Sequence, residues 1–437
     1  MFLTKRFYWA MAVVAFVMAL GVKWESLLQV GQWLLIALFV VTVVDALMLY
    51  VMARMAARRD CATRFSLGDE NHVNVVVANK SPISLDVEMV DELPFQFQQR
   101  DFSMRLKLKA KESKRVDYGL RPTERGVYGF GNVLLFVSSK VGLVQRRIKT
   151  GDPCDVKVYP SFLMLRKYEL MAMSNNFSEV GVKRVRRAGN NTEFEQIRDY
   201  VQGDDYRTIN WKASARRSHL MVNSYQDERS QQIYSVIDKG RLMQQSFNGM
   251  TLLDYAINAA LVLSYVAINK QDKAGLVTFA DQFDTFVPAD RQPTQMQLIL
   301  ESLYHQQTTF GESDYSILCP NVNRLVGRRS FMMVYTNFTD FGSLDRQLPY
   351  LRLFNRYHRL LVVFFEDMEL NDYTRTPATS MEDMYQHVVA EKLIYERRLI
   401  VSTLKQNGIY CLLTSPTRLS VDVINKYMEM KSRQLLV

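Results

Sequence analysis

Residues 231–238, QQIYSVID, decide the fold of the second half of this 437-residue chain. The run is apolar and short, as in a strand buried on both faces, and residues 251–269, TLLDYAINAALVLSYVAIN, follow it with the length of a helix. That helix is apolar enough for a membrane span, but Asp254, Asn258 and Asn269 interrupt it. We therefore expect it to be buried against a sheet in the middle of a domain.

The same alternation of apolar strands and helices continues toward the C-terminus. Residues 274–289 predict a hairpin, and the runs at 330–336, 360–367 and 409–415 predict further strands with helical patterns between them. Strands this apolar are covered by helices on both faces, so residues 231–437 predict an α/β domain with a mostly parallel sheet. Ligands of such sheets bind at the C-terminal ends of the strands.

Residues 60–160 show a different period. Apolar and polar residues alternate through short segments such as NHVNVVVANKS and LDVEMVDELP, which Asn, Ser, Pro and Gly separate. Roughly six or seven strands over about 100 residues predict a β-sandwich of immunoglobulin-like size. No helix follows the glycines of residues 121–133, RPTERGVYGFGNV, so we interpret this stretch as a turn between strands and not as a phosphate-binding loop.

Two apolar runs within residues 1–56 predict a hairpin of membrane-spanning helices. Residues 7–22 carry no charge over 16 positions, and residues 33–53 carry one, Asp45, over 21. A cleaved signal peptide is the alternative for the first run, but a second apolar run directly after it argues against a lone signal peptide. A carboxylate is costly in hydrocarbon. Contact with a partner helix, snorkelling and protonation are therefore open alternatives for Asp45.

Basic residues indicate the orientation of the hairpin. Lys5 and Arg6 precede the first run, and Arg54, Arg58 and Arg59 follow the second. Because basic flanks stay on the cytoplasmic side, both ends are expected there. The predicted location is the cytoplasmic (inner) membrane, with multiple spans in the lipid bilayer and with both termini and the later domains in the cytoplasm.

The overall composition argues against a structural zinc site but does not identify a partner. Basic residues outnumber acidic residues by 55 to 45, which is too even a mixture to identify nucleic acid or a membrane surface from charge alone. No two of the five histidines stand four positions apart, so a structural zinc site is not expected. The cysteines stand far apart and are interpreted as buried or free thiols in a reducing compartment. They are Cys61, Cys154, Cys319 and Cys411.

Residues 194–217, FEQIRDYVQGDDYRTINWKASARR, mix acidic, basic and aromatic side chains within the predicted connection at residues 161–230. As an enzyme site, Glu193 or Asp204 would supply acid–base chemistry and Arg207 would clamp an anion. Residues 194–217 contain no histidine that could activate Ser214 as a nucleophile. As a nucleic-acid surface, the segment would carry too many carboxylates, because they repel phosphate.

We favour a scaffold or partner interface for this segment. The pattern then predicts a short helix at residues 193–201, a turn at Gly203-Asp204, and Ile209 and Trp211 anchored in the core, with the whole connection packed on the next domain. Acidic residues and arginines would pair to fix the segment against the sheet or a partner. The predicted signature and interface positions are Glu193, Arg198, Tyr200, Gly203, Asp204, Arg207, Trp211, Lys212, Ser214 and Arg216.

These residues closely resemble the signature of the bacterial family catalogued as domain of unknown function fifty-eight. The matching features are the run from Glu193 to Arg216, its position after two membrane helices and a β-sandwich, the RGVY stretch at 125–128, and Gly142-Leu143. The chain departs from the family where Ser139-Lys140 stands in place of a frequent Asp-Pro. The resemblance implies a von Willebrand factor A-like domain after the signature. It also implies a partner, because such proteins are commonly encoded beside MoxR-type AAA+ ATPases.

Domains of the A-like kind often hold a divalent cation through an Asp-x-Ser-x-Ser loop and oxygen ligands from two further loops, so the resemblance implies where a metal would bind. Here Gly240 and Leu242 replace the serines after Asp238, and Asn337 stands where an aspartate is expected. We expect a degenerate site without metal or cofactor, and magnesium or calcium remains the alternative. The positions of this site are Asp238, Gly240, Leu242, Ser313, Asp314, Asn337 and Asp340.

Together these patterns predict a membrane-anchored, non-enzymatic protein-interaction module without catalytic residues. The resemblance makes it an adaptor or partner of a MoxR-type AAA+ ATPase in a chaperone-like or assembly system. Other membrane or envelope proteins and the lipid bilayer are further expected partners, and nucleic acid is not. Two alternatives stay open: a metal-dependent A-domain that binds its ligand through Asp238, and an anion-handling hydrolase built on Glu193, Asp204 and Arg207.

Overall fold

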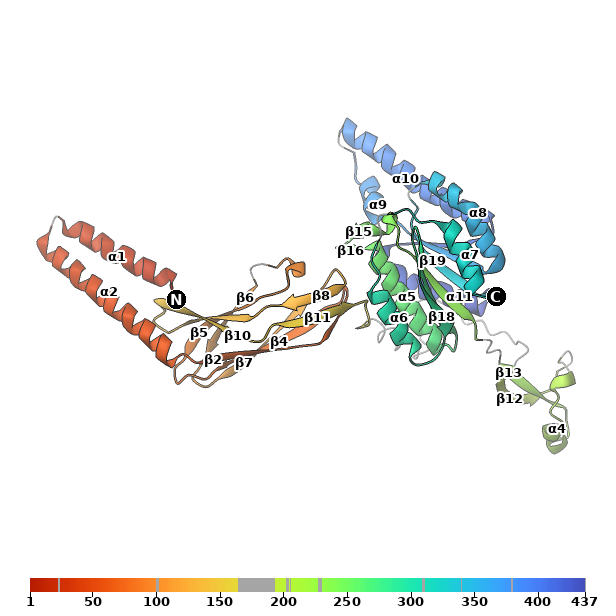
Figure 1. Ribbon diagram of the computed structural model, residues 1–437, viewed down its shortest axis with the longest axis horizontal. Helices are drawn as coiled ribbons and strands as arrows, with labels where there is room; N and C mark the ends of the chain where they lie inside the picture. Colours follow the sequence, from red (N-terminus) through yellow and green to blue (C-terminus); the bar gives the residue numbers. More distant parts are fainter. Residues whose placement is uncertain are drawn as a thin grey trace. The chain divides into compact units, whose positions relative to one another are not determined.

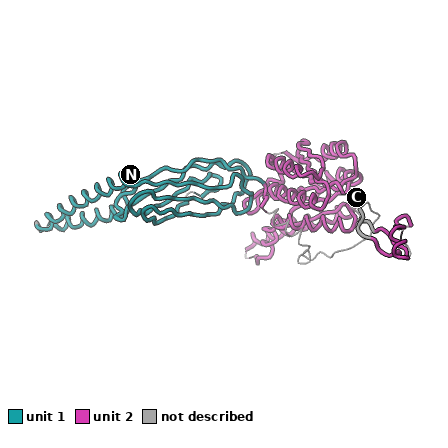
Figure 2. The backbone as a smooth tube through the Cα atoms, turned by 90° about the horizontal axis from the view of Figure 1, so that it is seen from below, with its two compact units in different colours: residues 1–159 teal, residues 160–437 magenta. Residues whose placement is uncertain are grey.

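The computed structural model divides into two compact units, residues 1–159 and residues 160–437 (Figure 2). The described residues are 1–22, 24–99, 102–163, 193–201, 204, 206–226, 230–308, 311–338, 340–378 and 380–436, without the side chains of residues 25, 193–196 and 224–226. The predicted turn residue Gly203 lies outside the described residues, as do residues 164–192 of the predicted connection.

Unit 1 begins with a helical hairpin, α1 (Lys5–Gly21) and α2 (Glu25–Met52), drawn in red and orange in Figure 1. α2 starts earlier than the predicted run at residue 33. Its residues Ser26–Met52 are long and apolar enough to cross a membrane, and most of their large apolar side chains are exposed. An exposed apolar surface of this length indicates a membrane protein.

Two glycines let α1 and α2 approach each other closely. A Cβ atom on Gly21 would lie 2.7 Å from the backbone nitrogen of Leu28, and one on Gly31 would lie 2.6 Å from the side chain of Met18. Small residues at such positions let helix backbones approach closely. In lipid, helices associate through this close packing, because no hydrophobic effect drives them together. The hairpin is therefore packed at both glycines.

The rest of unit 1 is a set of short strands. They are β1 (Phe2–Leu3), β2 (Met55–Cys61), β3 (Arg64–Ser66), β4 (Asn71–Asn79), β5 (Leu85–Asp91), β6 (Ser103–Leu108), β7 (Ser113–Leu120), β8 (Gly126–Phe130), β9 (Val133–Ser138), β10 (Val144–Thr150) and β11 (Cys154–Tyr159), with a 3₁₀ turn at Phe95–Phe97. Their sheets have the orders β1-β10-β9-β5-β6, β2-β4-β7 and β3-β11-β8. Every second residue of β5 is buried, as expected where one face of each strand lines a core. We name the strands β2 to β11 the β region. It begins at Met55, before the predicted boundary at residue 60.

Asp45 joins the hairpin to the loop between β9 and β10. One carboxylate oxygen accepts the backbone N–H groups of Leu143 and Val144, each at 3.1 Å, and the other accepts the Ser139 hydroxyl at 2.5 Å. Asp45 is 3% exposed. Its partners are therefore groups of its own chain, an arrangement that the sequence analysis does not predict.

Further bonds hold the same loop and β10 against the hairpin. Arg146 donates to the carbonyls of Leu49 at 3.0 Å and Tyr50 at 2.9 Å, and its guanidinium lies 5.1 Å from the Tyr50 ring centroid. The Thr4 hydroxyl donates to the Gly142 carbonyl at 2.5 Å. β1, which precedes α1, pairs with β10. Both helices are thus attached to the β region by hydrogen bonds.

Unit 2 is built on a six-stranded sheet with the order β18-β17-β14-β19-β20-β21. Its strands are β14 (Gln232–Asp238), β17 (Lys273–Phe279), β18 (Phe283–Asp290), β19 (Phe331–Tyr335), β20 (Arg359–Phe365) and β21 (Tyr410–Thr414). β18 runs antiparallel to β17, and every other neighbouring pair is parallel. The sheet is therefore mostly parallel, and residues 274–289 form a hairpin, as the apolar runs predict.

Helices cover both faces of this sheet (Figure 1). α5 (Leu252–Asn269), α6 (Gln295–Tyr304) and α11 (Leu419–Ser432) share one apolar core, and α7 (Tyr315–Leu325), α8 (Phe341–Tyr357) and α10 (Met381–Gln406) share the other. β14 divides between them, with Ile233 and Ile237 in the first core and Tyr234 and Val236 in the second. α5 is largely buried, which confirms that its apolar sequence serves the core.

Several short elements were not predicted. They are η4 (Arg241–Gln244), β15 (Ser246–Phe247), β16 (Met250–Thr251), α9 (Met368–Arg375) and a 3₁₀ turn at Pro416–Arg418. The signature segment contains β12 (Glu193–Asp199), η3 (Tyr206–Thr208), α4 (Trp211–Arg217) and β13 (Met221–Gln226). The helix predicted at residues 193–201 is wrong, because this stretch pairs as a strand with β13.

Candidate functional site

The signature residues form a small structure that we name the signature arm, the described part of residues 193–226. β12 and β13 pair antiparallel, with Arg198 opposite Val222 and Asp199 opposite Met221. Ile209, just before α4, adds an isolated bridge to Val222. Met221 and Val222 are buried, so the paired strands and the helix between them enclose a small core.

Asn210 and Ser214 fix α4 against β13. The Asn210 side chain caps the helix by accepting the Ala213 N–H at 3.0 Å. The buried Ser214 hydroxyl donates to the Asn210 carbonyl at 2.8 Å and accepts the Met221 N–H at 2.9 Å. Because the hydroxyl is used in both directions, its role is to hold the helix.

Asp204 is held by a two-pronged ion pair with Arg198. The guanidinium donates to the two carboxylate oxygens at 2.9 and 2.6 Å, and the Val201 N–H donates at 2.9 Å. The bonds from Arg198 first, and then from Val201, hold the pKa of Asp204 below its ordinary value. A carboxyl group kept charged in this way is a poor proton donor. Glu193, its partner in the hydrolase alternative, has a side chain outside the described residues.

The aromatic and basic signature residues lie on the outside of the arm. Trp211 and Tyr206 are each 70% exposed, and the Arg207 guanidinium lies 5.7 Å from the Tyr206 ring centroid. The predicted anchoring of Trp211 in the core is therefore wrong. Tyr200 is half-buried, and its N–H donates to the Leu220 carbonyl at 2.9 Å. α4 has no acidic residue and three exposed basic residues, Lys212, Arg216 and Arg217.

A second candidate site lies at the C-terminal ends of β14 and β19. Here the strand order reverses, which is where open α/β sheets bind ligands. Asp238 ends β14 and is 2% exposed. One carboxylate oxygen accepts the Thr336 hydroxyl at 2.6 Å, and the other accepts the Gly240 N–H at 2.8 Å and the Ser313 hydroxyl. Asp238, Gly240 and Ser313 thus come together as predicted, and Thr336 at the end of β19 was missed.

Ser313 fills the space that a serine at position 240 would need. A Cβ atom on Gly240 would lie 2.1 Å from the Ser313 hydroxyl oxygen. Burial raises the pKa of Asp238, against the opposite effect of its hydrogen bonds from Ser313, Thr336 and Gly240. The carboxylate therefore lies in a buried environment whose nearest groups are neutral donors.

The donor set at Asp238 does not fit a hard cation. Magnesium and calcium need several oxygens that turn lone pairs toward the ion, and both carboxylate oxygens of Asp238 already accept hydrogen bonds. Within the described part of the chain, no three His, Cys, Asp or Glu side chains converge as a metal site. The nearby cations pair elsewhere, Lys239 with Asp284 at 2.5 Å and Arg241 with Glu312 at 2.8 Å.

The other predicted positions divide between helix caps and the wall of the cleft. Asp314 caps α7 by accepting the Ser316 N–H at 2.8 Å, and Asp340 caps α8 by accepting the Ser343 N–H at 2.7 Å. Asn337 is buried, and its side-chain oxygen has no hydrogen-bond partner among the described residues. Both aspartates thus serve as helix caps, and Asp340 also lines the cleft at Asp238.

The cleft is small. Its volume is about 180 Å³, and Leu242, Asn337 and Asp340 line it together with Arg346, which lies 4.0 Å from Glu312. Ligand pockets in proteins are typically about 300–1,000 Å³. A single protruding side chain of a partner suits this cleft better than a cofactor does.

A further exposed surface lies on α10, where the sequence analysis predicts no site. Met381, Tyr385, Val388 and Tyr395 are 85%, 72%, 65% and 65% exposed. Their spacing places the first three close to one side of the helix. Lys392, which lies between Val388 and Tyr395 at helical spacing, is also exposed, so this face resembles the signature arm in pairing aromatic with basic side chains and is a useful comparison for it.

The family model described as Protein of unknown function DUF58 matches residues 196–374. The matched range contains most of the signature arm and the sheet of unit 2 through β20. A curated relative, Uncharacterized protein YeaD of Bacillus subtilis (strain 168), is 25% identical over 217 residues. That match covers 48% of this chain and 54% of the relative, so it spans about half of each protein.

Solved structures resemble a quarter of the chain. The CARDB domain of the PF1109 protein from Pyrococcus furiosus is 15% identical, with 25% of this chain and 90% of that chain covered and a TM-score of 0.20. The ASH / PapD-like domain of human CEP192 is 8% identical, with 25% and 85% covered and a TM-score of 0.17. Likenesses at this level carry no functional information. The middle of the chain is therefore similar to a family whose function is unknown.

Proposed function

We propose that this protein is a membrane-anchored, non-enzymatic protein-interaction module whose signature arm binds a partner protein. The observation that carries the proposal is that one set of signature residues holds the fold of the arm and another set is exposed on it. Asp204, Arg198, Asn210 and Ser214 hold the fold through hydrogen bonds. Trp211, Lys212, Arg216 and Arg217 are exposed without a structural task visible in the described residues.

Exposed tryptophan beside arginine is the composition that protein interfaces concentrate at their energetic centres. Burying Trp211, which is 70% exposed, would contribute apolar area that the free protein leaves in water. The basic residues of α4 would add complementarity to an acidic partner surface, mainly by speeding association. An acidic protein surface with an apolar pocket is therefore the partner chemistry that fits.

The apolar α2 supports the membrane anchor. We propose that the protein lies in the cytoplasmic (inner) membrane and that α1 and α2 both span this membrane. Lys5 and Arg6 precede the hairpin and Arg54 follows it, and basic flanks of this kind stay on the cytoplasmic side. The strands of unit 1 that follow the hairpin and the whole of unit 2 then lie in the cytoplasm, where an ATP-driven partner can reach the arm.

The partner that we propose is a MoxR-type AAA+ ATPase, on the strength of the family resemblance. The mostly parallel sheet and the small cleft at Asp238 are compatible with a von Willebrand factor A-like domain that binds protein without metal. The protein would then be an adaptor that brings the ATPase, or its cargo, to the membrane. Neither a metal-dependent ligand binder nor a hydrolase gains support from the geometry at Asp238 or Asp204.

Affinity purification of the full-length protein after crosslinking in cells tests the proposal. We expect wild-type protein to recover a AAA+ ATPase, and Trp211→Ala and Arg216→Glu to reduce that recovery at least tenfold. Tyr385→Ala, which removes another highly exposed aromatic, and Arg328→Glu, which reverses another exposed charge, are matched controls. Recovery that is unchanged by the arm variants, or absent from the wild type, would overturn the proposal.

A further inference from the structure

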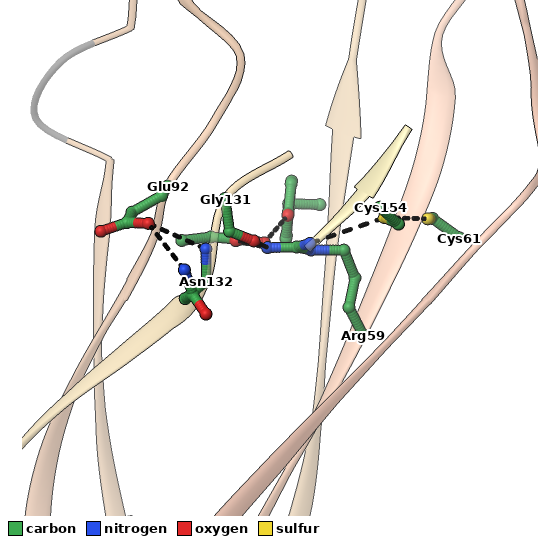
Figure 3. Close-up of polar contacts among 8 residues, drawn as sticks. Arg59, Cys61, Glu92, Gly131, Asn132 and Cys154 are labelled. Carbon is green, nitrogen blue, oxygen red and sulfur yellow. Dashed lines mark hydrogen bonds and ion pairs between the residues drawn. The ribbon is translucent and has the colours of Figure 1, made fainter. Parts of the chain in front are cut away.

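Two cysteines that are far apart in the sequence meet in the β region of unit 1. Cys61 ends β2 and Cys154 begins β11, and their sulfur atoms lie 3.7 Å apart (Figure 3). β2 and β11 belong to different sheets. Both cysteines are partly exposed, so a small solute can reach them. The distance is that of two sulfurs in van der Waals contact, so a disulfide requires them to move closer.

A buried arginine lies against this pair. Arg59 Nη1 approaches the Cys154 sulfur at 3.7 Å, and the guanidinium donates to the Gly131 carbonyl at 3.1 Å (Figure 3). The same guanidinium forms a two-pronged ion pair with Asp91. The Arg59 side chain is 2% exposed and that of Asp91 is fully buried. The Tyr118 hydroxyl donates to Asp91 from the other side. The guanidinium is therefore held in place beside Cys154.

This arrangement distinguishes the two sulfurs. The Arg59 Nη1 N–H is directed to the Cys154 sulfur and can donate to it. Burial, and then the neighbouring Cys154 sulfur, raise the pKa of the Cys61 thiol to about 11. The donor beside Cys154 and the burial of Cys61 make Cys154 the sulfur that reacts first and Cys61 the sulfur that reacts second.

The other cysteines differ in both respects. Cys319 is buried in a core of unit 2, where burial raises the pKa of its thiol to about 12. The sulfur of Cys411 is directed to the Val401 carbonyl at 3.7 Å. Among the described residues, neither sulfur contacts another cysteine. They serve as internal controls.

We propose that Cys61 and Cys154 are a reversible oxidation site that forms a disulfide when the chain meets a peroxide. The Cys154 thiolate attacks one oxygen of hydrogen peroxide, the O–O bond breaks, and the hydroxide that leaves takes a proton to become water. The product is Cys154 sulfenic acid. The Cys61 sulfur then loses its proton to solvent, attacks the Cys154 sulfur and expels the second hydroxide, which becomes water. Two thiols are oxidised, one peroxide is reduced to two waters, and a dithiol reductant reverses the change.

The bond would join the first strand after the hairpin to the last strand of unit 1. β2 follows α2 directly, and β11 ends at Tyr159, the last residue of unit 1. Because β2 and β11 lie in different sheets, the disulfide would fasten one sheet to another. Oxidation therefore changes how firmly the two ends of the β region are held together.

Peptide mapping of the full-length protein in detergent tests this site. After reduction, brief treatment with hydrogen peroxide and blocking of free thiols, we expect one crosslinked peptide pair, containing Cys61 and Cys154, that disappears after dithiothreitol. Cys319 and Cys411 should be recovered as blocked thiols. Absence of the pair while either Cys61 or Cys154 accumulates as sulfenic or sulfinic acid would overturn the proposal.

Single variants test the order of the steps without relying on the crosslink. In Cys61→Ser, dimedone should trap sulfenic acid at Cys154. In Cys154→Ser, labelling of Cys61 should be at least tenfold slower. Equal labelling rates in the two variants would contradict the assignment of Cys154 as the attacking sulfur. If a variant fails to fold, the wild-type peptide pair still decides whether the disulfide forms.

Discussion

Replacing Asp45 by alanine should loosen the loop between β9 and β10 from α2. The change removes the acceptor of the Leu143 and Val144 N–H groups and of the Ser139 hydroxyl. A buried donor left without a partner costs about 1–3 kcal/mol, so two backbone donors cost roughly 2–6 kcal/mol. Removing a buried carboxylate also relieves its own desolvation, which favours the low end, about 2–3 kcal/mol.

Hydrogen exchange of the Leu143 and Val144 amides measures this loss directly. Because each 1.4 kcal/mol is a factor of ten, a loss of about 2–3 kcal/mol speeds exchange by roughly 30- to 150-fold. Mass spectrometry of the full-length protein in nanodiscs would follow the peptide that covers residues 139–146. Amides of β4 that pair with β7 should exchange at the wild-type rate.

Asp45→Asn is the matched control. Its amide oxygen can still accept the two backbone N–H groups, and its NH₂ can donate to the Ser139 oxygen. We expect exchange to rise tenfold or less, because only the charge contribution is lost. If Asp45→Ala left the Leu143 and Val144 amides within twofold of wild type and instead changed the oligomeric state, Asp45 would contact a partner helix and the junction described here would be wrong.

Three other changes test separate parts of the structure. Ser214→Ala should weaken the signature arm by about 1–3 kcal/mol, seen as faster exchange of the Met221 amide, because it leaves that buried N–H without its acceptor. Burial, and then Arg329, lower the pKa of His358 from 6.5 to about 4, so its neutral form contributes stability that is present above pH 6.5 and is lost as the pH falls toward 4. Between pH 6.5 and pH 4, the free energy of unfolding in urea should fall by up to about 3 kcal/mol less in His358→Gln than in wild type. Equal losses in the two proteins would refute the assignment. Calorimetry with magnesium, manganese and calcium should show no sub-millimolar binding, and binding that Asp238→Ala abolishes would restore the metal-dependent alternative.

The sheet and its helices could be predicted because both of their faces are buried. The apolar runs of β14, β19 and β20 leave no other environment for these residues, and the order of strands and helices then follows the chain. The C-terminal ends of β14 and β19 could also be predicted to meet, since parallel strands end at one edge. The family resemblance, and not the strand order, implied that Asp238 and Ser313 lie together, and the Ser313 hydroxyl donates to Asp238.

The signature arm was predicted less well because long-range pairing decides it. Phe194, Ile197 and Val201 repeat at helical spacing, but β12 pairs with residues 221–226 and becomes a strand. Trp211 was expected in a core because large aromatic residues usually are, and the small core formed by Met221 and Val222 leaves it outside.

The contacts of Asp45 and of the cysteines lie beyond local sequence patterns. Asp45 bonds to Leu143 and Val144, and Cys61 meets Cys154, each across a long stretch of chain whose folding brings them together. The cap roles of Asp314 and Asp340, in contrast, could be predicted, because an aspartate directly before a helical pattern is a recognisable N-cap signal. The sequence analysis instead assigns both aspartates to the degenerate metal site.

Photo-crosslinking from position 211 tests the central claim most directly. A benzophenone amino acid would replace Trp211 in the full-length protein in cells, and the same amino acid at Tyr385 would be the control, since both positions are highly exposed aromatics. The proposed function predicts a crosslink from position 211 to a AAA+ ATPase that changes with ATP depletion, and none from position 385. A crosslink to the ATPase from position 385 alone, or none from either position, would contradict it.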